Sequence, residues 1–171
     1  MTQSFDPSAI DAFVQIRSAK SPAVSPDGQW LAYLSDASGF NQLWITSLGG
    51  GAPRQVTDMP EPIGAFAFNP KGAGILFTMD TGGDERHQLW LLPDIDAQPV
   101  ALTQAASVVH LWGAWSPEGT RIGYASNGRS PHDMDVHVMD VATRTVSTVL
   151  TGTGMREVLA FFPDGQSLLV R

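Results

Sequence analysis

The chain of 171 residues has no cysteine, only two lysines and no apolar run of membrane-spanning length. Without cysteine, disulfide bonds and thiolate metal sites are excluded. The formal net charge of −7 and the lack of a basic cluster argue against nucleic-acid binding, which needs grouped Lys and Arg. A membrane span needs ~20 apolar residues, and the first ten residues lack the basic and long apolar regions of a signal peptide. We therefore expect a cytoplasmic protein that binds neither nucleic acid nor membrane.

Glycine and proline are abundant instead, with 17 and 12 residues. They fall at intervals along the chain and do not gather in one linker. Hydrophobic residues make up 43% of the sequence and charged residues 16%, which is a composition that folds. Regularly spaced Gly and Pro between apolar runs indicate many turns and short strands.

A turn motif of the form X-Pro-[Asp/Lys/Glu]-Gly occurs four times, with 44, 47 and 46 residues between successive prolines. Proline presets φ for the first central position of a type I turn, and glycine accepts the positive φ with which the next strand departs. The motif therefore predicts four hairpin turns. Its residues are Pro26 and Gly28, Pro70 and Gly72, Pro117 and Gly119, and Pro163 and Gly165.

Short apolar runs enter and leave each turn, and a third and a fourth run follow it. The third runs include QLWIT from Gln42 and QLWLL from Gln88. Four strands at this period are typical of a β-propeller blade. We predict an all-β fold, a partial β-propeller of four-stranded antiparallel blades with three full blades plus half of a fourth; an ordinary antiparallel sandwich is the alternative. The predicted blades span about residues 22–57, 64–103, 112–150 and 158–171.

Residues 1–20 form a separate preamble to the predicted propeller, which spans residues 21–171. In DPSAIDAFVQIR, Asp6 is a candidate N-cap and Pro7 suits the first helical position. Ile10, Phe13 and Val14 would share one helix face. The pattern predicts a short amphipathic helix, with a preceding strand as the alternative.

At these residues the sequence resembles the N-terminal propeller of the prolyl oligopeptidase family, especially its acylaminoacyl-peptidase and dipeptidyl-aminopeptidase-like branch. The resemblance covers nearly the whole chain. It rests on IDAFVQIRSAKSPAVSPDGQWLAYLSD, on GGDERHQLWLL and on SNGRSPHDMDVHVMD. TolB-type propellers carry the same SPDG turns, so the preamble and the GGDE–QLW block are the more specific features.

The resemblance implies a two-domain serine peptidase in which the propeller covers an α/β-hydrolase domain that follows it in sequence. Nothing in this chain matches that domain. A nucleophile elbow reads Gly-x-Ser-x-Gly, whereas the sequences around Ser130, in a predicted polar loop, and Ser167, in a predicted strand, lack the final glycine. We therefore expect no catalytic residue and no cofactor in this chain, and a parent protein that is an acylaminoacyl- or oligopeptidase-type enzyme.

The acidic loop GGDERH is the main candidate for substrate binding, because in the resembled family the loops between second and third strands face the hydrolase. A guanidinium suits a carbonyl or carboxylate, and carboxylates suit an ammonium group. Arg86, with Asp84 and Glu85, is therefore predicted to contact substrate, and Arg129 in the next blade is a second candidate. An ion pair within or between loops is the alternative for these residues.

The HDMDVH segment offers an alternative metal site, because Asp133, Asp135 and His137 would share one face of a strand. The repeat favours a structural role, since Asp135 occupies the position of Gln42 and Gln88. We expect no metal. His87 and His110 have no partners at ligand spacing and are expected to be ordinary loop or strand-end residues.

Two functional hypotheses follow. In the first, the chain is a noncatalytic propeller segment of a cytoplasmic serine peptidase that gates and positions short peptides for its α/β-hydrolase domain. In the second, it is a TolB-type propeller that acts as a protein-interaction scaffold. In both, the half-blade leaves an edge strand over residues 167–171, through which we expect self-association.

Overall fold

The structure is a computed structural model that describes residues 17–72 and 74–171, and it contains strands but no helix within these ranges. Within the described residues, no helix is therefore long and apolar enough to cross a membrane. The helix predicted over residues 6–17 lies, up to residue 16, outside the described residues. The all-β prediction is confirmed.

The strands form three four-stranded antiparallel sheets and one two-stranded sheet, which we call blades 1 to 4. Blade 1 contains β1 (Ala19–Val24), β2 (Trp30–Ser35), β3 (Gln42–Ser47) and β4 (Arg54–Gln55); blade 2 contains β5 (Ile63–Phe68), β6 (Ile75–Met79), β7 (Gln88–Leu92) and β8 (Val100–Ala101); blade 3 contains β9 (His110–Trp115), β10 (Arg121–Ser130), β11 (Asp133–Asp140) and β12 (Val146–Leu150); blade 4 contains β13 (Val158–Phe161) and β14 (Leu168–Val170).

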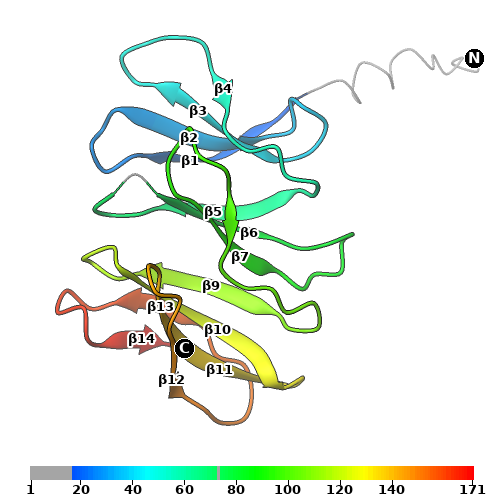
Figure 1. The fold of residues 1–171 in the computed structure, drawn as a ribbon, viewed down its shortest axis with the longest axis vertical. Helices are drawn as coiled ribbons and strands as arrows, with labels where there is room; N and C mark the ends of the chain where they lie inside the picture. Colours follow the sequence, from blue (N-terminus) through cyan, green and yellow to red (C-terminus); the bar gives the residue numbers. More distant parts are fainter. Residues whose placement is uncertain (1–16, 73) are drawn as a thin grey trace, which may run out of the picture.

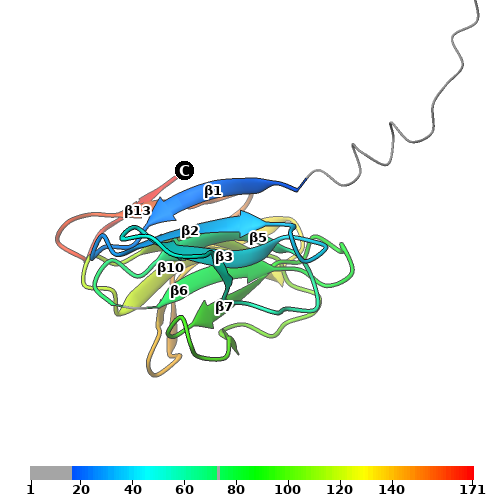
Figure 2. The ribbon, with the colours of Figure 1, turned by 90° about the horizontal axis from the view of Figure 1, so that it is seen from above.

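Each blade is a meander in which strands follow one another in chain order, and the blades lie face to face in an open stack (Figure 1). The first strands lie along one side of the stack, so β5 contacts β1 and β9 contacts β13. Figure 2 shows β1 and β13 on the same side of the molecule, with β7 on the opposite side. This arrangement confirms the partial propeller of three full blades and half of a fourth.

β1 begins at Ala19, inside the segment assigned to the preamble. Its pairing with β2 shifts between Lys20 and Ala23, and Ser21 has a φ of 54°. This irregularity interrupts the alternation of side chains that marks a strand in a sequence. The start of the first blade was therefore predicted a few residues too late.

The motif turns have the predicted geometry in blades 1, 3 and 4. In blade 1 the Gly28 N–H donates to the Ser25 carbonyl at 2.9 Å. Gly28, Gly119 and Gly165 have φ values of 69°, 73° and 66°. This combination of a type I turn and a left-handed glycine reverses the chain between the first two strands of the blade.

The turn of blade 2 differs, and the positive φ predicted for Gly72 is wrong. Asn69 takes the place of Ser25 here. Its Oδ1 accepts the N–H of Lys71 at 2.9 Å, and its Nδ2 donates to the Gly119 carbonyl of blade 3 at 2.8 Å. The asparagine therefore organises this turn and also links it to the next blade.

Two hydrophobic cores fill the spaces between blades. The first joins Leu34, Leu43 and Ile45 of blade 1 to Ile75, Phe77 and other buried residues of blade 2. The second joins Leu76 and Leu89 of blade 2 to Ile122, Tyr124 and Met139 of blade 3. Both faces of blade 2 are covered, which explains why the five residues of β6 are all buried.

Blades 3 and 4 approach more closely, through glycine. A Cβ atom added to Gly113 in β9 would lie 2.5 Å from Cβ of Val158 and 2.8 Å from its carbonyl oxygen. Only glycine allows this contact between the first strands of the two blades.

The fourth strands of blades 1 and 2 have only two residues each. Thr57 and Thr103, which lie just beyond β4 and β8, accept the N–H groups of Leu43 and Leu89 with their side-chain hydroxyls, each at 2.9 Å. The threonine hydroxyls take the place of a backbone acceptor there, while the carbonyls of Leu43 and Leu89 still accept backbone N–H groups.

Candidate functional site

The first residue of each QLW motif connects a blade to the linker that follows it. Gln42 donates from Nε2 to the carbonyls of Met59 and Glu61 at 3.2 and 3.3 Å, and its Oε1 accepts the Met59 N–H at 2.9 Å. Gln88 repeats this arrangement in blade 2, where its Nε2 donates to the carbonyls of Ala105 and Val108. The glutamine amide therefore supplies both a donor and an acceptor to the linker.

Asp135 occupies the same position in blade 3 and is only 2% exposed. A carboxylate accepts hydrogen bonds but cannot donate to linker carbonyls. Arg129 supplies the missing donors. Its Nε and Nη2 donate to the two oxygens of Asp135 at 2.7 and 3.0 Å, and Nη2 also donates to the Gly152 carbonyl at 2.6 Å.

The electrostatics of this pair follow from its geometry. The hydrogen bonds from Arg129 lower the pKa of Asp135, and the carboxylate in turn raises the pKa of Arg129. Asp133 lies 3.6 Å from the same guanidinium and accepts the Gly154 N–H at 2.9 Å. Arg129 therefore forms the ion pair that was the alternative for this residue. Its contact with substrate stays a prediction.

The segment that carries Arg129 also differs from the predicted polar loop. β10 extends to Ser130 and pairs with Asp133 at the start of β11, so that only Pro131 and His132 form the connection. Ser130 is thus the last residue of a strand. The polar letters SNGRSPHD resemble a loop, but their backbone is part of a long hairpin.

The loop between β6 and β7, residues 80–87, is held in shape by its own acidic residues. Asp80 accepts the Glu85 N–H at 3.0 Å, and Asp84 accepts the Arg86 N–H at 2.9 Å. Gly82, Gly83 and Glu85 all have φ between 60° and 74°. A positive φ at Glu85 is unfavourable for a non-glycine residue and often marks a functional segment.

The predicted residues of this loop have different surroundings. The carboxylate of Asp84 accepts a hydrogen bond from the loop backbone, and the side chain of Arg86 is exposed. Among the described residues, Arg86 forms no salt bridge, in contrast to Arg129. Glu85 lines a groove together with residues that are far from it in the sequence.

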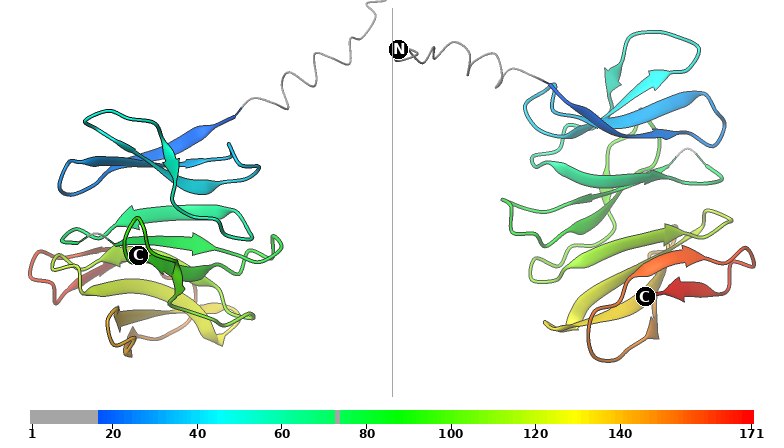
Figure 3. Two further views of the ribbon diagram at one scale, coloured as in Figure 1. Left: turned by 45° about the horizontal axis from the view of Figure 1, so that its top comes forward. Right: turned by 180° about the vertical axis from the view of Figure 1, so that it is seen from behind.

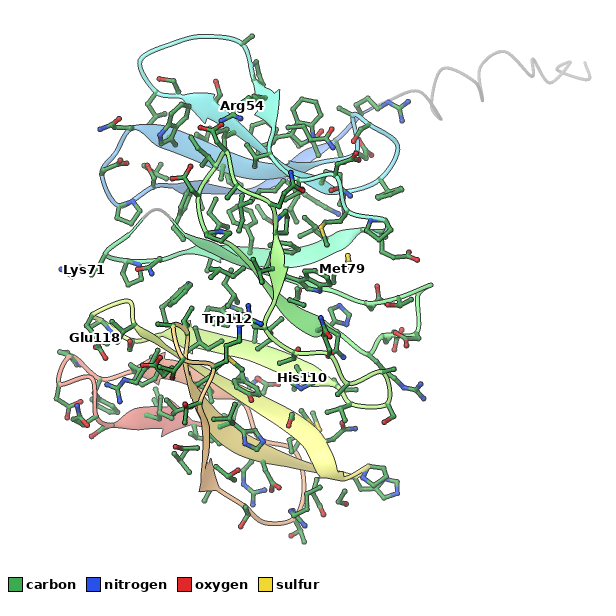
Figure 4. All side chains as sticks on the ribbon, in the orientation of Figure 1. Arg54, Lys71, Met79, His110, Trp112 and Glu118 are labelled. Carbon is green, nitrogen blue, oxygen red and sulfur yellow. The ribbon has the colours of Figure 1, made fainter. Side chains whose placement is uncertain are left out.

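The groove has a volume of about 820 Å³ and lies where β5, β9 and β13 begin. We call it the inner-strand groove. Its polar side chains include those of Glu85, His87, His110 and Glu157, and its apolar surface includes Trp112 and Leu159. Figure 4 shows His110 and Trp112 together on β9, at the end of the blade away from Glu118 in the motif turn.

His110 is the buried titratable residue of this groove, where Thr78 is also buried. It is 7% exposed, and its Nδ1 atom has no hydrogen-bond partner. Burial lowers the pKa of His110, so the imidazole is neutral near pH 7. The unpartnered Nδ1 atom has almost no exposed surface, so the imidazole forms part of the wall of the groove and adds no positive charge to it.

The carboxylates of the groove are not equivalent. Glu157 forms a salt bridge with Arg171, whereas Glu85 has no ion pair among the described residues. From the sequence, His110 was expected to be an ordinary loop or strand-end residue, and Glu157 was not considered. Both stand at or next to the start of a first strand, and only the stacking of blades 2, 3 and 4 brings them to Glu85.

A serine–histidine contact elsewhere does not have the environment of a nucleophile. Ser126 Oγ lies 3.0 Å from Nε2 of His137, whose Nδ1 lies 3.0 Å from the hydroxyl of Thr148. A catalytic histidine is normally oriented by a carboxylate, and its serine is accessible. Ser126 is buried, and Tyr124 stacks on His137. Among residues 17–72 and 74–171, no group of three His, Asp or Glu side chains is arranged to hold a metal.

Comparisons with known proteins support a propeller and a link to peptidases. No protein-family model matches the chain. A segment of 65 residues is 42% identical to the uncharacterized peptidase YuxL of Bacillus subtilis (strain 168), which corresponds to 37% of this chain and 10% of that protein.

Solved structures resemble the chain over most of its length. The putative TolB from Agrobacterium tumefaciens matches 89% of this chain and 53% of its own, with a TM-score of 0.68 and 23% identity. A putative dipeptidyl aminopeptidase IV from Bacteroides ovatus matches 91% of this chain and 26% of its own, with a TM-score of 0.67 and 12% identity. The chain thus spans about half or less of these relatives and shares its fold with propellers of both TolB proteins and peptidases.

Proposed function

We propose that the chain is the noncatalytic propeller segment of a cytoplasmic serine peptidase, and that it gates and positions short peptides for an α/β-hydrolase domain carried elsewhere in the same protein. The segment shared with the peptidase YuxL supports this assignment. The observation that carries it is the inner-strand groove, which combines an unpaired carboxylate, a buried neutral imidazole and an apolar wall.

The chemistry of the groove suits the amino end of a peptide. The carboxylate of Glu85 attracts an ammonium group, and the neutral imidazole of His110 adds no competing positive charge to the groove. Trp112 and Leu159 provide apolar contact for the first side chain. Arg86, on the same loop as Glu85, would bind a carbonyl or carboxylate farther along the peptide.

Peptide titrations followed by amide NMR test this proposal on the 171-residue chain. A short peptide with a free amino end should shift the signals of Gly64, His110 and Gly113, and its N-acetylated form should bind more weakly. Glu85→Gln should reduce affinity about 2- to 5-fold, the size expected for a solvent-accessible charge pair. Glu118→Gln, in the motif turn at the opposite end of the blade, is the control and should not change affinity. Equal binding of the free and acetylated peptides would contradict the proposal.

A TolB-type interaction scaffold is the second candidate, and the likeness to the Agrobacterium protein supports it. The gene sequence that encodes the region after residue 171 separates the two. A Gly-x-Ser-x-Gly elbow followed by Asp and His would support the peptidase. A reading frame that ends after further blades would support the scaffold.

A further inference from the structure

A second hollow lies beside the outer strands of blade 3, where the described part of blade 4 has two strands. It has a volume of about 510 Å³ and lies between β14 and the outer strands β11 and β12 of blade 3. We call it the outer-strand groove. Its wall includes Val136, Val138, Val149 and Leu150, and its charged lining residues, Arg121 and Asp140, have opposite signs. The net charge of −7 is therefore not concentrated here.

The equivalent surfaces of the preceding blades are covered by a third strand. In blade 2, Trp90 and Leu92 of β7 pack against the core of blade 1. In blade 3, Met139 of β11 belongs to the core shared with blade 2. The described part of blade 4 has no third strand, and all five residues of β12 are exposed. An apolar face therefore adjoins the edge of β14. The right-hand view in Figure 3 shows β14, in red, beside β13 in the two-stranded sheet.

The hydrogen bonds of blade 4 show which groups are free at this edge. Arg171 exchanges two backbone hydrogen bonds with Glu157, and Ser167 accepts one from Phe162. Because backbone groups alternate in direction along a strand, the N–H groups of Leu168 and Val170 point away from β13. Leu168 and Val170 direct their side chains into the outer-strand groove, and Leu169, on the opposite face, is 48% exposed.

Symmetry limits how a second copy can use this edge. A two-fold axis perpendicular to the sheet of blade 4 would pair the two β14 strands antiparallel. It would also place both copies of blade 3 on the same face of the combined sheet. Each blade 3 is two strands wider than blade 4, so the projecting β11 and β12 strands would occupy the same space. An axis parallel to the strands pairs β14 in parallel and places the two copies of blade 3 on opposite sides.

The second arrangement is self-complementary. This two-fold axis turns the partner's half-blade over. The face of that half-blade on which Leu169 is exposed would therefore lie against the outer-strand groove of the first copy. By symmetry, Leu169 of the first copy would lie against the groove of the partner. The two half-blades would form one four-stranded sheet between two copies of blade 3. That is the number of strands in each complete blade of this chain.

We propose that the outer-strand groove and the free edge of β14 form a self-association surface, through which the 171-residue chain forms a symmetric dimer with parallel β14 strands. Each Leu169 fills the groove of the other copy. In a longer chain whose next strand pairs with β14, the same surface would be covered from within.

Sedimentation velocity over a hundredfold range of concentration tests the proposal. The wild-type chain should change from monomer to dimer as concentration rises. Leu169→Lys and Val149→Lys should each weaken dimer formation at least ~10-fold, because each would bury an unpaired charge. Leu48→Lys is the matched control, since Leu48 lies at the end of blade 1 remote from β14 and, like Val149, is 52% exposed. It should leave association unchanged.

Hydrogen exchange provides a second readout that does not depend on substitutions. The amides of Leu168 and Val170 should become protected as concentration rises, because they point toward the partner strand. A monomer at every concentration would overturn the proposal. So would association that the lysine variants at positions 149 and 169 leave intact, or that Leu48→Lys reduces equally.

Discussion

Blades 2 and 3 come from the same repeat, yet the loops between their second and third strands are used in opposite ways. In blade 2 the loop is bent by residues with positive φ, and Arg86 is exposed. In blade 3 the strands continue into a long hairpin, and Arg129 binds Asp135 and the Gly152 carbonyl.

One residue of the repeat accounts for much of this difference. The side-chain amide of Gln88 forms the hydrogen bonds to the linker, so Arg86 in the neighbouring loop is not needed to form them. Asp135 has no donor, and Arg129 completes the connection. An arginine in the loop between the second and third strands is therefore available for a ligand when the residue that starts the third strand supplies both the donor and the acceptor to the linker.

The motif turns of blades 2 and 3 also differ, and a substitution there is expected to have the largest effect on the stability of the chain. Gly119→Val should destabilise the chain by roughly 1–3 kcal/mol, because a β-branched residue is forced to positive φ. An added Cβ would also lie 2.1 Å from Oδ1 of Asn69. Gly72→Val should cost much less, since Gly72 lacks a positive φ and its nearest contact would be 3.7 Å away. Equal midpoints of urea unfolding for the two variants would show that the two turns do not differ in this way.

Placing a glutamine at position 135 of blade 3, the position that Gln88 occupies in blade 2, tests the role of Arg129. Arg129→Ala should lower Tm by several degrees, because the Gly152 carbonyl loses its donor and Asp135 keeps only the Gly152 N–H. Adding Asp135→Gln to this variant should recover most of the loss, since the amide can donate to the linker as Gln88 does in blade 2. A double variant that is no more stable than Arg129→Ala would contradict this account of the position.

The ion pair of blade 3 also predicts a difference in acid sensitivity. Arg129 lowers the pKa of Asp135 in the folded chain below its unfolded value of about 3.9. The pair therefore stabilises the fold above that value, and its contribution is lost as pH falls through the lower folded pKa. Asp135→Asn should lower Tm at pH 7, and the difference from wild type should narrow toward pH 3. A constant difference across this range would exclude the predicted linkage.

The repeat made the fold predictable, because turn chemistry and apolar runs recur at a nearly constant period. Its departures were not predictable from local sequence. The early start of β1 is concealed by the irregularity at Ser21, and the φ of Gly72 depends on an asparagine that also bonds to another blade. Of the predicted substrate-binding residues, only Glu85 lines the inner-strand groove. His110 and Glu157 reach it through blade stacking, which no spacing within one blade encodes.

The two arginines provide the most direct test of the central claim, which is that Arg86 is available for substrate and Arg129 holds the blade together. Thermal unfolding and titration with a short peptide are measured for Arg86→Ala and Arg129→Ala in parallel. We predict that Arg86→Ala leaves Tm unchanged and weakens peptide binding, whereas Arg129→Ala lowers Tm and leaves binding unchanged at temperatures where the variant is folded. Unchanged binding by Arg86→Ala, or weakened binding by a fully folded Arg129→Ala, would contradict the claim.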